Sequence, residues 1–431
     1  MYYFSCPYKK TEMDVVIIVI GLLYFLGHYL SHFFQRTMIP DVLVLILIGM
    51  VIGPVFHWAT PENFGMVGNV FTSIALIVIL FEGGLSLELS SISHSMKTSS
   101  ILTLLFFAIT ALIVATVLYS VLHFPVMVSL ITGFILGGTS SAVVLPLVSA
   151  LKMGDKPSTI LILESALTDV LCIVFVIGFL NGYQTGEVEP GKIVGGLISS
   201  LVLASVIGII SAYVWLRLLK WVRQFPNTQF TTFAFMFVVY GLAEYFGFSG
   251  AIASLAFGII LGNYDKISIP MVNSTRLPFG IITEVEKSLY REIVFLLKLY
   301  FFIYLGLSIP FHNWNSIWVA ALVVGLIYLA RLVTTRFLIR ENFPWNDKAM
   351  ISVMVPKGLA AAVLAGLPLQ YGIEQGEQIR AITYYVVLIS ILATSVLIPL
   401  IKNTFVGKVY QVIFREKRGS EHVNAANPIK E

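Results

Sequence analysis

Long runs of predominantly apolar residues dominate the chain. Residues 41–55, 67–81 and 101–122 are examples. An α-helix needs about 18–20 apolar residues to cross the roughly 30 Å hydrocarbon core of a bilayer, and these runs approach or exceed that length. Aromatic residues are spread through the runs and do not alternate with polar ones, unlike the pattern of a transmembrane β-barrel. The pattern therefore predicts an all-α polytopic membrane protein.

Breaks in the apolar pattern divide the chain into about thirteen transmembrane helices, among them a fourth at 99–123, a fifth at 125–151 and a twelfth at 347–371. Alternate loops then lie on opposite sides of the membrane, and the cationic residues are shared unequally between the two sides. One side carries only Lys9, Lys10, Lys192 and Arg380. The other side carries the remaining loop cations and the basic tail, so the positive-inside rule makes it cytoplasmic. We expect a multi-pass protein of the plasma (inner) membrane with its N-terminus outside and its C-terminus in the cytoplasm.

Composition agrees with this class and excludes others. Hydrophobic residues make up 58% of the 431 residues and charged residues 12%, and the mean hydropathy is +0.90. Soluble domains carry roughly a quarter charged residues, so this chain cannot cover a water-facing surface. The two cysteines, Cys6 and Cys172, form neither a disulfide framework nor a metal-binding spacing. No segment outside the membrane is long enough for a soluble domain, so we expect membrane lipid as a partner, no nucleic acid and no cofactor.

The order of the spans predicts two related halves. Six spans, one long linker span and six further spans would place equivalent helices in opposite orientations, as in inverted-repeat transporters. The predicted organisation is an N-terminal extension at 1–13, a first inverted repeat at 14–182, a linker span at 183–227, a second inverted repeat at 228–403 and a cytoplasmic tail at 404–431. Within the extension, Met13 is an alternative start of the chain.

Each half contains one span that is interrupted by helix-breaking residues. The fifth span of the first half contains Gly137 and Gly138, and the fifth span of the second half contains Pro356 and Gly358. Unwound backbone inside a membrane is tolerated only where protein or a water-filled cavity satisfies its polar groups. Single kinks are common in membrane helices, but a matched pair beside ionisable residues favours two broken helices that cross at a substrate site.

Ionisable residues in the middle of two spans mark the expected site. The sixth span carries Glu164 and Asp169, and the eleventh carries Arg331. Such groups usually line an ion path or pair with one another. A buried guanidinium needs a carboxylate partner, and Glu164 is the expected partner of Arg331. Asp169 then remains as an alkali-cation site at which a proton and a hard cation compete for the same oxygens. The alternative is that both carboxylates are structural ions.

Oxygen-bearing residues near Asp169 are candidate ligands for this cation. Thr168 and Ser165 lie on the same helix, and Thr139 and Ser140 lie at the first break. Hydroxyl and carbonyl oxygens suit hard cations.

Three further ionisable residues are candidate accessory groups. Lys357, at the second break, is placed to balance helix ends that point inward. Glu244 is expected either to form a structural pair, with Lys357 as the candidate partner, or to lie on a proton path. Glu82 lies near a cytoplasmic helix end, where it serves either an entry funnel or the membrane boundary.

In this order, the motifs resemble the monovalent cation:proton antiporter superfamily, especially its sodium/proton exchanger branch. The resemblance covers nearly the whole membrane region and rests on residues 39–49, 80–85, 242–250 and 258–263, the first break at Thr139, the Glu-Ser-x-x-x-Asp motif from Glu164, Arg331 and Lys357-Gly358. It implies a homodimer in which a core domain moves against a dimerisation domain. It also implies that Asp169 is the cation/proton carboxylate, that Glu164 and Arg331 are a structural ion pair, and that Thr139 and Ser165 belong to the cation site.

Two departures from the resemblance bear on the transported ion. Electroneutral exchangers of this kind carry Asn-Asp in the sixth span and electrogenic ones Asp-Asp, whereas this chain has Thr168-Asp169. A single titrating carboxylate favours one cation for one proton, and therefore electroneutral exchange. The first break has Thr139-Ser140-Ser141 instead of Thr-Asp-Pro, which leaves Na⁺, Li⁺ and K⁺ open.

The expected function is exchange of a monovalent cation for protons by alternating access, with a role in pH homeostasis. The alternative is an organic-solute or anion symporter with the same inverted-repeat fold, although a charged Asp169 beside hydroxyl groups favours a cation. A membrane-embedded enzyme would need a His-rich or Cys/His constellation near the midplane, which the sequence lacks, so no enzymatic activity is expected. A sensor or channel is a further class, which the two broken helices fit less well than a carrier.

Overall fold

The computed structural model of the protein describes residues 21–22, 24–29, 41–59, 74, 77–78, 80–85, 89–186, 190–226, 228–266, 283–309, 314–339 and 343–414. The predicted extension at 1–13, parts of the first and third predicted spans, and the tail beyond residue 414 lie outside the described residues.

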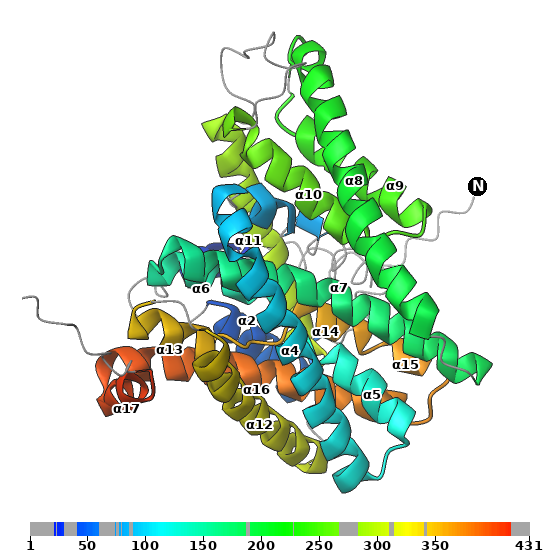
Figure 1. The fold of residues 1–431 in the computed structure, drawn as a ribbon, viewed down its shortest axis with the longest axis vertical. Helices are drawn as coiled ribbons and strands as arrows, with labels where there is room; N and C mark the ends of the chain where they lie inside the picture. The colour runs from blue at the N-terminus through cyan, green and yellow to red at the C-terminus, as the bar shows by residue number, and fades with distance from the viewer. Residues whose placement is uncertain are drawn as a thin grey trace, which may run out of the picture.

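Every regular element among the described residues is helical, which confirms the predicted all-α class. The elements, shown in Figure 1, are α2 (Asp41–Met50), η1 (Val51–Val55), α4 (Leu89–Leu122), α5 (Val126–Ile135), α6 (Ser141–Leu151), α7 (Asp155–Thr185), α8 (Pro190–Val222), α9 (Thr231–Tyr245), α10 (Gly250–Gly262), η3 (Tyr264–Lys266), α11 (Glu284–Leu307), α12 (Trp314–Leu338), α13 (Trp345–Val353), α14 (Leu359–Leu364), α15 (Leu367–Gln370), α16 (Gly376–Asn403) and α17 (Phe405–Ile413).

Five helical stretches among the described residues are long and apolar enough to cross a membrane: Ser99–Leu122, Asp155–Thr185, Val202–Val222, Trp314–Leu338 and Gly376–Asn403. Other helices are shorter, and five of them arise because two predicted spans are broken. The span predicted at 125–151 is divided into α5 and α6, and that at 347–371 into α13, α14 and α15. The total of about thirteen spans stays a prediction.

The fourth predicted span differs at its start, because α4 begins at Leu89 and not near residue 99. Residues 89–98 are mostly polar, yet they are helical. An apolar run indicates only the part of a helix that lies in the hydrocarbon core. The helix itself can continue into polar sequence beyond that run.

The helices form two groups that α7 connects. In Figure 1, α8, α9 and α10 lie together at one end of the molecule, α12, α13, α16 and α17 gather toward the other, and α7 runs between the two groups. Small residues allow close packing, as expected where lipid gives helices no hydrophobic reason to associate. Gly49 on α2 and Gly306 on α11 face each other so closely that a Cβ on either would lie 2.9 Å from the other's Cα.

Helix α7 is the element that positions the polar core. It packs against α4, α5, α6, α8, α13 and α14. Four polar residues on this helix are consequently removed from the molecular surface: Glu164, Ser165 and Thr168 are 0% exposed and Asp169 is 3% exposed. Polar groups this deep need partners. The first broken helix supplies them to Thr168 and Asp169, α12 supplies the partner of Glu164, and the Ser165 hydroxyl bonds within α7.

Candidate functional site

The two helix breaks meet at one point. The first connector runs from Leu136 to Ser140, between α5 and α6, and the second runs from Met354 to Gly358, between α13 and α14. The backbone N–H of Ser140 donates a hydrogen bond to the carbonyl oxygen of Pro356 at 2.8 Å. Two segments that are distant in the sequence are therefore joined backbone to backbone, as the pair of breaks predicted.

Side chains of neighbouring helices satisfy the backbone that the breaks expose. The N–H of Thr139 donates to the hydroxyl oxygen of Thr168 on α7 at 3.1 Å, and the N–H of Lys357 donates to the hydroxyl oxygen of Ser390 on α16 at 2.9 Å. A buried N–H without a partner would cost several kcal/mol in an apolar medium. Each hydroxyl thus holds one connector in place.

Asp169 lies beside this crossing in a small pocket. Its neighbours in the pocket wall include Thr139, Ser140, Ser141 and Gly358. The hydroxyl of Ser141 donates to Asp169 Oδ2 at 3.4 Å. The Ser140 side chain is buried, and its hydroxyl has no hydrogen-bond partner among the described residues. A carboxylate, an unpartnered hydroxyl and unwound backbone together form an oxygen-rich site that suits a small hard cation.

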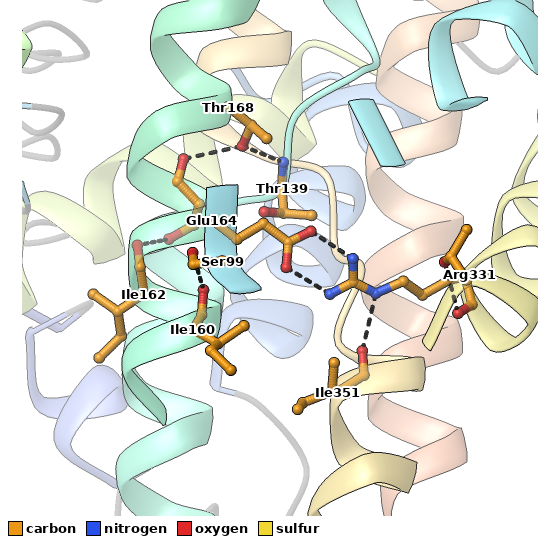
Figure 2. Close-up of polar contacts among 10 residues, drawn as sticks. Ser99, Thr139, Ile160, Ile162, Glu164, Thr168, Arg331 and Ile351 are labelled. Atoms are coloured by element: carbon orange, nitrogen blue, oxygen red, sulfur yellow. Dashed lines mark hydrogen bonds and ion pairs between the residues drawn. The ribbon is translucent and has the colours of Figure 1, made fainter. Parts of the chain in front are cut away.

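The structure gives Ser165 and Thr168 other contacts than the predicted ones. The Ser165 hydroxyl donates to the carbonyl oxygen of Ile162 at 2.9 Å. The Thr168 hydroxyl donates to the carbonyl oxygen of Ser165 at 3.1 Å and accepts from Thr139 N. Figure 2 shows Thr168 bridging its own helix and the first connector. Neither residue lines the pocket beside Asp169. In this conformation Thr168 holds the connector that lines the pocket, and the Ser165 hydroxyl bonds within its own helix.

Two residues of the pocket wall whose side chains can bind a cation were absent from the predicted ligand set. Ser141 contacts Asp169 directly, and Cys172 lines the same pocket. The sequence held a signal for each, because Ser141 extends the Thr-Ser-Ser motif and Cys172 lies three residues after Asp169 on the same helical face. Only the tertiary structure shows that the start of α6 brings Ser141 to Asp169.

Glu164 and Arg331 form a buried bidentate ion pair. Arg331 Nη1 and Nη2 donate to Glu164 Oε1 and Oε2, each at 2.6 Å, and both side chains are buried (Figure 2). Arg331 Nε also donates to the carbonyl oxygen of Ile351 on α13 at 3.1 Å, and the guanidinium lies 4.5 Å from the centroid of the Phe106 ring. Both oxygens of Glu164 are thus committed to Arg331, and the pair links α7, α12 and α13.

The three candidate accessory residues are not brought together. Lys357 is 1% exposed, its Nζ lies 5.6 Å from the Phe106 ring centroid, and this nitrogen has no hydrogen-bond partner among the described residues. Glu244 is exposed in the last turn of α9, where its carboxylate accepts from Gly250 N at 2.7 Å. The proposed pairing of Glu244 with Lys357 is therefore wrong, because Glu244 instead bonds the start of the next helix. Glu82 is half-buried and outside the pocket wall.

Comparisons with known proteins agree with this architecture. The sequence profile of the family described as "Sodium/hydrogen exchanger, transmembrane" matches residues 21–403. The "K(+)/H(+) antiporter NhaP" of Alkalimonas amylolytica is 23% identical over 88% of this chain, and this chain spans 65% of that protein's length. The "Na(+)/H(+) antiporter 1" of Methanocaldococcus jannaschii is 24% identical, with 82% of this chain and 83% of that protein covered.

A solved structure shares the fold. The sodium proton antiporter MjNhaP1 from Methanocaldococcus jannaschii, determined at pH 8, superposes with a TM-score of 0.71 over 94% of this chain and 100% of that chain. The sequence identity in this match is 21%, so the likeness concerns the fold.

Proposed function

The chain belongs to the sodium/hydrogen exchanger family of transmembrane proteins, and from that membership we propose that it exchanges a monovalent cation for protons across a membrane. The observation that carries the proposal is the position of Asp169 beside the crossing of the two broken helices, next to the unpartnered hydroxyl of Ser140. A carboxylate in this position can hold a proton or a cation, but the two compete for the same oxygens. That competition couples the two movements.

In the proposed cycle, different residues bind the ions, support the connector and form the structural ion pair. Asp169 binds the cation and the proton, with oxygen ligands from Ser140, Ser141 and the connector at Thr139. Thr168 supports the connector through its bond to Thr139 N, and the carbonyl oxygen of Ser165 accepts from the Thr168 hydroxyl. Glu164 and Arg331 remain paired throughout. Because one carboxylate carries the exchange, we propose an electroneutral ratio of one cation to one proton.

The larger arrangement is proposed in the same terms. The halves at 14–182 and 228–403 are inverted repeats, and alternating access comes from movement of one helix group against the other. From the family membership we propose a homodimer in the plasma membrane. We place its C-terminus in the cytoplasm because most loop cations fall on that side. Na⁺, Li⁺ and K⁺ remain the candidate cations.

The test is an exchange assay on the purified protein in proteoliposomes that contain a pH-sensitive dye. Pulses of Na⁺, Li⁺ or K⁺ are expected to move protons in the opposite direction, and the ion that responds at the lowest concentration defines the preference. Choline pulses and protein-free liposomes are the controls. An imposed membrane potential is expected to leave the rate unchanged if exchange is electroneutral. If no alkali cation moves protons in well-folded protein, the proposal is wrong.

A first variant tests the crossing itself. Gly358→Ala is expected to reduce exchange by about tenfold or more. Overpacking of this kind costs about 1–3 kcal/mol, and about 1.4 kcal/mol of it falling on the transport barrier slows exchange tenfold. A Cβ at position 358 would overlap the side chain of Ser140 and force the two connectors apart. The rate of cation-driven proton movement, normalised to folded protein in the liposomes, is the measurement.

Gly325→Ala is the matched control for this variant. Gly325 lies within α12, and a Cβ there would meet nothing within 4 Å. Full activity of Gly358→Ala would show that the crossing tolerates a wider separation than the structure indicates.

A further inference from the structure

We propose that the pocket beside Asp169 also binds a soft monovalent metal cation, with the thiol of Cys172 as its principal ligand. Ag⁺ is the probe ion for this site. Bound there, it would occupy the space that the transported cation needs and block exchange; this second part rests on the proposed function, whereas the binding itself does not.

The first argument is the position of the thiol. Cys172 is 0% exposed and lines the same pocket as Asp169. The two residues are three apart on α7, so their Cβ atoms are neighbours on one helical face, about 5–6 Å apart. A metal ion bound to sulfur on that face has a carboxylate oxygen within reach.

The second argument is the unused polar atom on the opposite wall. Ser140 contributes a hydroxyl that is buried and has no hydrogen-bond partner among the described residues. It lies in the wall of the pocket that holds Asp169 and Cys172. A buried hydroxyl without a partner carries an unfavourable desolvation energy, which a bound cation would relieve. The pocket therefore offers one soft and two hard donors around one space.

The thiol itself loses little on binding a metal. The Cys172 Sγ contact within the protein is a long one, 3.9 Å from the carbonyl oxygen of Ile135 at the end of α5. Buried cysteines commonly behave as small apolar residues, but apolar packing does not require a carboxylate and a free hydroxyl in the same pocket. Thiolate ligands select soft cations such as Cu(I), whereas carboxylates suit hard ions.

The binding step is a simple exchange of a proton for a metal ion. Ag⁺ forms a bond to Sγ of Cys172 as the S–H bond breaks, and the released proton passes to the Asp169 carboxylate or to water. No electron is transferred and the net charge is conserved. A metal on this sulfur would lie against the first connector, because a Cβ on Gly138 would be only 2.9 Å from Sγ.

The binding experiment uses purified full-length protein in chloride-free detergent buffer, with Ag⁺ titrated by calorimetry. A Cys6→Ser background removes the other cysteine, and Cys172→Ser is then added to it. The chain has 12 methionines, which also bind soft metals. Binding at Cys172 is therefore measured as the difference in Ag⁺ bound between the two proteins. We expect one high-affinity Ag⁺ per chain in the background protein and none in the Cys172→Ser protein. Equal high-affinity binding by both would overturn the proposal.

The transport experiment measures the Ag⁺ concentration that halves each variant's own exchange rate. We expect the half-inhibiting Ag⁺ concentration to be at least about tenfold higher with Cys172→Ser than in the Cys6→Ser background protein. In the background protein, we expect saturating alkali cation to raise the half-inhibiting Ag⁺ concentration. High-affinity Ag⁺ binding at Cys172 in folded protein that exchanges no alkali cation would support the metal site and contradict the proposed function. Inhibition that is unchanged in Cys172→Ser would contradict the metal site and leave the proposed function standing.

Discussion

Replacing Asp169 with asparagine is expected to reduce coupled exchange to the background of protein-free liposomes. The amide cannot bind and release a proton, so coupling is lost even if some cation still binds. Cation binding should weaken as well, because contacts to a charged group are worth about 1.5–3 kcal/mol, or roughly 10–150-fold in affinity. The measurement is the proton movement that a saturating cation pulse drives in the pH-dye assay.

The asparagine variant should still fold. Its amide oxygen can accept the hydrogen bond that Ser141 now donates to Asp169 Oδ2, and its volume is nearly unchanged. Asp169→Glu is the second variant: it keeps a titrating carboxylate in a displaced position, so slower but still coupled exchange is expected. Glu377→Gln is the matched control, because it removes a carboxylate that is 64% exposed at the start of α16. Exchange by Asp169→Asn at the wild-type rate would exclude Asp169 as the shared site.

Replacing Arg331 with methionine is expected to destabilise the protein by about 3–5 kcal/mol, the usual cost of removing one partner of a buried ion pair. The variant leaves the Glu164 carboxylate buried without a counter-charge and removes the donor to Ile351 O, so α7, α12 and α13 lose their shared contact. The loss of stability is measured by heating the protein in detergent to a series of temperatures and determining the fraction that stays monodisperse. Exchange is expected to fall in proportion to the protein that remains folded.

Two further variants separate burial from charge. Glu164→Leu combined with Arg331→Met removes both ions, and replacing a buried pair by apolar residues is often neutral or stabilising, so the double variant should regain most of the lost stability. Arg380→Gln breaks the exposed ion pair between Arg380, 41% exposed, and Glu377, 64% exposed. This variant should lower the free energy of unfolding by no more than about 1 kcal/mol. A single Arg331→Met variant as stable as Arg380→Gln would refute a structural role for the buried pair.

The sequence placed the chemistry of the candidate site well where chemistry alone restricts the choice. A guanidinium in the middle of an apolar span has few tolerable partners, and the carboxylate assigned to Arg331 is the one that the structure places against it. The family resemblance, drawn from the order of the motifs, is confirmed by the match over residues 21–403. The roles of these residues in exchange, and the boundaries of the two predicted repeats, stay predictions.

The hydroxyls expected as ligands on α7 lie outside the pocket, because closeness in sequence does not determine which way a hydroxyl points. Thr168 is adjacent to Asp169, yet its hydroxyl bonds the first connector and not the pocket. The pairing proposed for Glu244 failed for a related reason. An exposed carboxylate in the last turn of α9 finds the free N–H of Gly250 at the start of α10, and that local partner is nearer than any distant cation.

The sequence by itself determined that this is an all-α membrane protein with two interrupted spans and ionisable residues at depth. These are properties of single segments, because the length of an apolar run, a helix-breaking residue and a charge in that run each act through local physics. Only the tertiary structure decided which polar side chains line the pocket beside Asp169 and which bond elsewhere. That choice depends on how closely the two connectors cross, and the crossing is set by the Ser140–Pro356 backbone bond and by the missing side chain at Gly358. These contacts join segments from opposite halves of the chain, and no local pattern in the sequence encodes their geometry.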